Sequence, residues 1–90
     1  MVIENLVEKL VAVAREHQVP LGAAEHLVQN WLATDPLQDT APVLTLTDMI
    51  NHWQYHYPQV WGNWSGTSSL LAAEMVKCLR ENPDLFDPES

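Results

Sequence analysis

The chain has ninety residues, of which 47% are hydrophobic, so it can form one domain with a core and is not disordered throughout. Twelve Asp and Glu residues outnumber four Lys and Arg, and the net charge of −8 disfavours nucleic acid or an anionic membrane as a partner and favours a basic protein. One cysteine excludes an intrachain disulfide, and no apolar stretch approaches the roughly 20 residues of a membrane span.

The start of the chain does not resemble a signal peptide. Glu4, Glu8 and Lys9 interrupt its apolar residues, which makes it too charged for the hydrophobic region of such a peptide. We therefore expect a cytoplasmic protein. Only 18% of the residues are charged, so a homo-oligomer that covers part of the neutral surface stays open as an alternative.

The first two predicted helices cover residues 2–17 and 21–33. In the first, one face collects apolar residues at helical spacing: Ile3, Leu6, Val7, Leu10, Val13 and Ala14. Pro20 interrupts the pattern, because proline cannot continue the hydrogen-bond ladder of a helix. The apolar stripe of the second helix consists of Leu21, Ala24, Leu27, Val28, Trp31 and Leu32.

The segment that joins these two helices has the spacing of a known motif. Ala14 is followed by a turn at Val19, and then by an apolar i, i+3/i+4 pattern over about nineteen residues in all. The segment resembles the helix-turn-helix motif, which implies a DNA-binding transcriptional regulator that would read bases with His26 and Asn30. It departs from the motif at Gln18, where glycine is usual, and its outward face carries no Lys or Arg to anchor phosphates. We keep DNA binding as an alternative, and packing or protein contact as the better interpretation of the hairpin.

Two further helices are predicted, at residues 46–57 and 67–81. Thr45 and Asp48 match a capping box at the start of the third helix, Leu44 and Met49 match a hydrophobic staple, and Pro58 ends it. Its predicted inner face consists of Met49, Ile50, Trp53 and Tyr57. The buried stripe of the fourth helix consists of Leu71, Met75, Cys78 and Leu79, and a short acidic tail follows it.

All four predicted helices are apolar on one side only. Such helices bury their apolar stripes against one another. The sequence therefore predicts an all-α fold, a single compact four-helix domain over residues 1–90, arranged as a bundle or as orthogonal helical hairpins.

A metal site is one alternative for the third helix. His52 and His56 are four residues apart on one flank, a spacing at which two histidines can share a zinc ion. Asp48 lies on the same flank, but about 12 Å of helix separates it from His56, so one ion cannot take all three. No cofactor is predicted. We also predict no enzyme, because Cys78 lies mid-helix on an apolar stripe and the sequence has no phosphate loop.

The most distinctive stretch is residues 44–66, which holds three of the four tryptophans and both tyrosines. Tyr and Trp are the residues most enriched at binding hot spots. We therefore predict a non-enzymatic protein–protein interaction module, such as a regulator, adaptor, inhibitor or assembly factor. The predicted docking residues are Tyr55, Trp61 and Trp64, flanked by His52 and His56. The alternative for the tryptophans is that they close one end of the core.

Overall fold

Four helices of twelve to fifteen residues dominate the computed structural model, which describes residues 4–62, 64 and 66–82. They are α1 (Glu4–Glu16), α2 (Leu21–Leu32), α3 (Pro42–His56) and α5 (Ser68–Glu81). A 3-10 turn η1 (Pro36–Gln38) and a one-turn helix α4 (Pro58–Trp61) complete the elements. The predicted all-α, four-helix fold is confirmed. None of the helices described is long and apolar enough to cross a bilayer.

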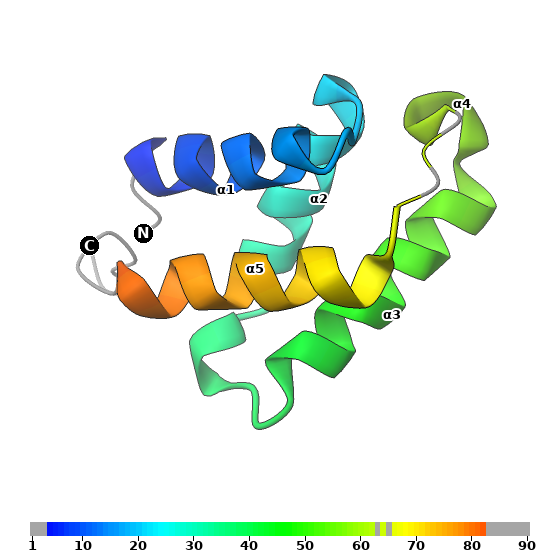
Figure 1. Cartoon of the computed structure of the whole chain (residues 1–90). Helices are drawn as coiled ribbons and strands as arrows, with labels where there is room; N and C mark the ends of the chain where they lie inside the picture. The colour runs from blue at the N-terminus through cyan, green and yellow to red at the C-terminus, as the bar shows by residue number, and fades with distance from the viewer. Residues whose placement is uncertain (1–3, 63, 65, 83–90) are drawn as a thin grey trace.

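The helices cross one another instead of forming a near-parallel bundle. In Figure 1, α1 and α5 lie side by side and run in opposite directions, while α2 crosses behind them at a steep angle. α3 packs against the other side of α5, so α5 separates α1 from α3. α4 then turns the chain back from the end of α3 toward α2. Of the two predicted arrangements, the structure adopts the orthogonal one.

A single cluster of apolar side chains fills the space between the helices, and all four long helices contribute to it. Its largest fully buried members are Trp31, Leu6, Leu10, Leu27, Leu46, Ile50, Leu71, Met75, Leu79, Val19 and Val28. Not every residue of the predicted stripes is fully buried. Several pack half-buried against the cluster: Val7, Val13, Met49, Trp53 and Cys78. Leu21 is 53% exposed and Tyr57 is 43% exposed, while Ile3 lies outside the described residues. Burial still raises the pKa of the Cys78 thiol. Among the described residues, the indole N–H of Trp31 is buried without a hydrogen-bond partner.

The turn after α1 holds Gln18 in the left-handed backbone conformation, with φ at 67°. The amide of Val19 donates to the carbonyl of Ala14 at 3.1 Å, and the amide of Gln18 donates to the carbonyl of Arg15 at 2.9 Å. These two bonds form the Schellman motif, and the side chains of Ala14 and Val19 are both fully buried there. An L side chain is strained at this position, which is why glycine is usually found in it.

Replacing Gln18 with glycine should raise the free energy of unfolding by about 0.5–1 kcal/mol. The relief of left-handed strain, about 1–2 kcal/mol, exceeds the added entropy of glycine in the unfolded chain, about 0.5–1 kcal/mol. Urea denaturation measures the difference. Gln18→Ala is the matched control, because alanine removes the same polar side chain but keeps the strained Cβ. A glycine variant no more stable than the alanine variant would contradict the expected strain.

α3 begins at Pro42, four residues before its predicted start at residue 46. Proline suits the first helical turn, because its missing N–H would have no partner there in any case. Because α3 already begins at Pro42, the residues of the predicted capping box and of the predicted staple lie inside the helix, so both predictions are wrong.

Asp39 lies just before the start of α3. The Thr45 hydroxyl and the backbone amide of Ala41 donate hydrogen bonds to its carboxyl group, and these bonds lower the pKa of that carboxyl.

Candidate functional site

A connected group of aromatic and imidazole rings covers the C-terminal half of α3 and the neighbouring part of α2. We call it the aromatic surface, and its members are His26, His52, Trp53, Tyr55, His56 and Tyr57. α2 supplies one member, the residue after α3 supplies another, and α3 itself supplies the remaining four. The helical repeat of α3 brings most of these rings together, since residues three and four apart share a side of a helix.

Trp53 occupies the centre of the aromatic surface and is half-buried. Its ring centroid lies 4.5 Å from that of His26, in an edge-to-face contact, and 4.8 Å from that of Tyr57. On the other side, the His52 ring lies 5.6 Å from Trp53 and 4.4 Å from His56. Each ring is thus held by at least one neighbour, which reduces the side-chain entropy that docking of a partner would cost.

The outer edge of the aromatic surface is open to solvent. Tyr55 is 81% exposed, and its ring lies 5.0 Å from His56 in an edge-to-face contact. Tyr55 therefore points away from the core, and its ring is accessible to a partner. Tyr57 was predicted to be a core residue, but it is 43% exposed. α3 ends at His56, and Tyr57 leaves the helix at φ −132°, so the periodicity that pointed it inward no longer applies.

Trp61 does not belong to the exposed surface, contrary to the predicted docking site. It is only 2% exposed, and its ring centroid lies 5.4 Å from that of Trp64. The short helix α4 begins at Pro58 and carries Trp61 back into the core before Gly62, with φ at 62°, ends it. The alternative interpretation is therefore correct for Trp61: it closes one end of the core. Four residues are too few to show a helical period, so α4 could not be predicted from the sequence.

Trp64 anchors the connection before α5 to the end of α1. Its indole N–H donates to the carbonyl of His17 at 2.6 Å, and its own carbonyl accepts from the Gln54 side chain at 3.2 Å. Gly66 lies so close that an added Cβ would stand 2.5 Å from the Trp64 ring. Trp64 is half-buried, and its polar group is already used within the fold. We therefore omit it from the aromatic surface.

The side chains predicted to read DNA are both engaged within the protein. The His26 ring packs edge-to-face on Trp53, and the Asn30 amide donates to the carbonyl of His26 at 2.7 Å. Six of the twelve residues of α2 are buried, and the helix carries no Lys or Arg. Gln18 has a positive φ of 67° at the position where glycine is usual in the helix-turn-helix motif, but α2 lacks the cations that would hold phosphates.

The predicted metal site has two candidate ligands in the structure, and no third ligand lies near them among the described residues. His52 and His56 lie close enough to share an ion, with ring centroids 4.4 Å apart. Within residues 4–62, 64 and 66–82, however, no three His, Cys, Asp or Glu side chains are grouped so as to hold one. Structural zinc sites use four protein ligands and catalytic sites use three.

The chemistry of the aromatic surface suits contact with another macromolecule. Its rings offer apolar area, and its imidazole nitrogens and tyrosine hydroxyls offer hydrogen bonds at the margin. Comparisons with protein-family models, with curated proteins and with solved structures found no match. Function is therefore inferred from the residues and their geometry.

Proposed function

We propose that this protein is a non-enzymatic protein–protein interaction module, a cytoplasmic regulator, adaptor, inhibitor or assembly factor that docks through the aromatic surface. One observation carries the proposal: six rings are linked by successive ring-to-ring contacts, with Tyr55 81% exposed at their outer edge. Exposed aromatic side chains are ordinary when single. A connected group of them is typical of a contact site, and Tyr and Trp dominate the energy of such sites.

The partner best suited to this surface carries lysine or arginine around an apolar centre. Asp48 lines the same depression as His52 and Trp53, so a carboxylate stands beside the rings. A cation over an aromatic ring gains about 0.5–2 kcal/mol, and a neighbouring carboxylate adds to that attraction. The net charge of −8 would also steer a basic partner toward the protein.

The Tyr55→Ala variant tests the proposal. A partner captured from the host would be identified and purified, and its affinity measured by calorimetry with the wild type and the variant. We expect at least a tenfold loss of affinity, about 1.4 kcal/mol, because an exposed tyrosine at the edge of the ring group would be a hot spot. The helical circular-dichroism signal and the stability should not change, since Tyr55 contributes little to the core.

Leu70→Ala provides the matched control, because Leu70 is a large exposed hydrophobic residue on α5, outside the aromatic surface. Its loss should leave the affinity unchanged. If Tyr55→Ala and Leu70→Ala both bind the partner like the wild type, docking occurs elsewhere and the assignment of the aromatic surface fails.

A further inference from the structure

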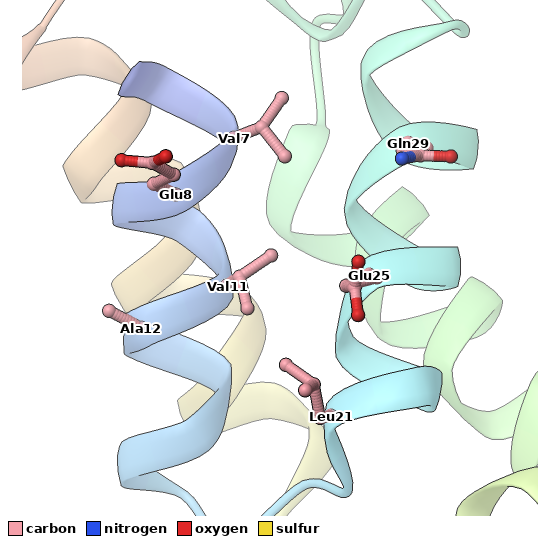
Figure 2. Close-up of a pocket in the computed structure, with 7 residues that line it drawn as sticks. All are labelled: Val7, Glu8, Val11, Ala12, Leu21, Glu25 and Gln29. Carbon is pink, nitrogen blue, oxygen red and sulfur yellow. The ribbon is translucent and has the colours of Figure 1, made fainter. Parts of the chain in front are cut away.

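A groove of about 710 Å³ runs between α1 and α2 (Figure 2). Val7 and Val11 project from α1 toward α2, and Leu21 projects from α2 toward α1. Leu21 is 53% exposed although it belongs to the apolar stripe of its helix, and neither valine is fully buried. The groove therefore has an apolar floor that the described part of the chain leaves open to solvent.

The groove continues beyond the residues drawn in Figure 2. A second hollow is lined by Val7, Gln29, Leu32 and Ala33, and it shares its first two residues with the groove. The joined hollows extend along α2 from residue 21 to residue 33, about 18 Å at 1.5 Å per residue. That length accommodates about three turns of a further helix.

The margin of the groove is acidic. Glu8 of α1 and Glu25 of α2 contribute carboxylates to the lining, and no Lys or Arg lines it. The two cations of α1 are used elsewhere. Lys9 donates to the Asn82 side chain at 3.1 Å, and the Arg15 guanidinium donates at 3.1 Å to a backbone carbonyl in the turn after α1. Neither hydrogen bond brings a positive charge to the groove.

We propose that this groove binds a basic amphipathic helix of a partner protein. The apolar side chains of that helix would seat on Val7, Val11 and Leu21, and its Lys or Arg side chains would pair with Glu8 and Glu25. A helix fits because both walls are helices, whose side chains form ridges four residues apart that a third helix can interdigitate with. The groove shares no residue with the aromatic surface, so this proposal does not depend on the proposed function.

Charge also separates this occupant from the other candidates. A second copy of the chain would bring a net charge of −8 against another −8, and like charge opposes association. The C-terminal residues 83–90 carry three carboxylates and no Lys or Arg, so they would be repelled by the same margin. A cationic helix is the occupant that both the floor and the margin of the groove attract.

A peptide of about 18 residues, with leucine and lysine at amphipathic helical spacing, is a suitable probe. Fluorescence anisotropy should show that it binds at least tenfold more tightly than the same peptide with glutamate in place of lysine. In spectra of the ¹⁵N-labelled protein, the amide shifts should be centred on Val7, Val11, Leu21 and Glu25. Equal binding of the two peptides, or shifts confined to the aromatic surface, would overturn the proposal.

Charge reversal at the margin supplies the decisive comparison. Glu8→Lys/Glu25→Lys should lower the affinity for the lysine peptide at least tenfold. Glu16→Lys/Glu81→Lys changes the net charge equally at exposed positions outside the lining and should lower it less than threefold. Equal losses in the two double variants would mean general attraction to an acidic protein, and would refute the groove.

The Leu21→Ser variant tests the floor of the groove. It should lower the affinity for the lysine peptide at least threefold, and it should not unfold the protein because Leu21 is already 53% exposed. Unchanged affinity would overturn the proposal. Sedimentation of the protein alone tests the second copy as occupant. A dimer that Leu21→Ser converts to a monomer would assign the groove to self-association and would likewise overturn the proposal.

Discussion

Replacing Trp61 with alanine should lower the free energy of unfolding by about 3–5 kcal/mol. The side chain is 2% exposed and packs against the Trp64 ring at a tilt, so its removal loses a large buried apolar area and leaves a cavity that a one-turn helix cannot close. Domains of this kind have about 5–15 kcal/mol of stability in total, so this single change would remove a large fraction of it. Urea denaturation followed by circular dichroism measures the loss.

Two comparisons make the Trp61 result specific. Tyr55→Ala removes an aromatic side chain from the surface and should change the free energy of unfolding by less than about 0.5 kcal/mol. Trp61→Phe, which keeps most of the apolar volume, should remain folded if the alanine variant does not. If Trp61→Ala and Tyr55→Ala were equally stable, Trp61 would not be a core residue, and the predicted docking role would apply to it again.

Replacing Trp31 with alanine should lower the free energy of unfolding by about 3–5 kcal/mol. Replacing it with phenylalanine should leave that free energy within about 1 kcal/mol of the wild type. Trp31 is fully buried, so alanine leaves a large cavity. Phenylalanine leaves only a small one, and it also removes an indole N–H that has no hydrogen-bond partner among the described residues. Burying an unpaired donor costs about 1–3 kcal/mol, and the relief of that cost offsets most of the lost packing.

Denaturation of the two Trp31 variants side by side is the measurement. The alanine variant reports how well the ring is packed, and the phenylalanine variant reports the state of the N–H group. If phenylalanine were as destabilising as alanine, the indole N–H would have a partner, such as a buried water, and Trp31 would not be an unsatisfied core residue.

The sequence predicts the existence of the four long helices well, because apolar periodicity alone places their core residues. Leu27, Val28 and Leu71 are all buried as expected. The start of α3 was missed because the segment carries two start signals, a Thr45 capping box and a proline at residue 42. Local sequence does not show which of these two signals starts the helix. The 3-10 turn and the hydrogen bonds of Asp39 hold the chain in place before Pro42, and they favour the earlier start.

The candidate sites were harder to predict than the helices. The exposure of Tyr55 follows from local sequence, because this residue lies opposite the apolar stripe of its own helix. Trp61 and Trp64 could not be placed, since their burial depends on how the chain folds back over α1 and α2 after Pro58. The groove was missed because Leu21 fits the apolar stripe of α2, and only the crossing of α1 and α2 leaves it open.

Because of the position of α2, substitutions on this helix should be tolerated less well than substitutions on the outer side of α5. One side of this helix faces the core, a second carries Leu21, Glu25 and Gln29 along the groove, and a third presents His26 to Trp53. A substitution almost anywhere on α2 therefore alters one of three environments. Among the described residues, the outer side of α5 has no such neighbours, so a fluorophore, a tag or a support could be attached there while both surfaces stay accessible.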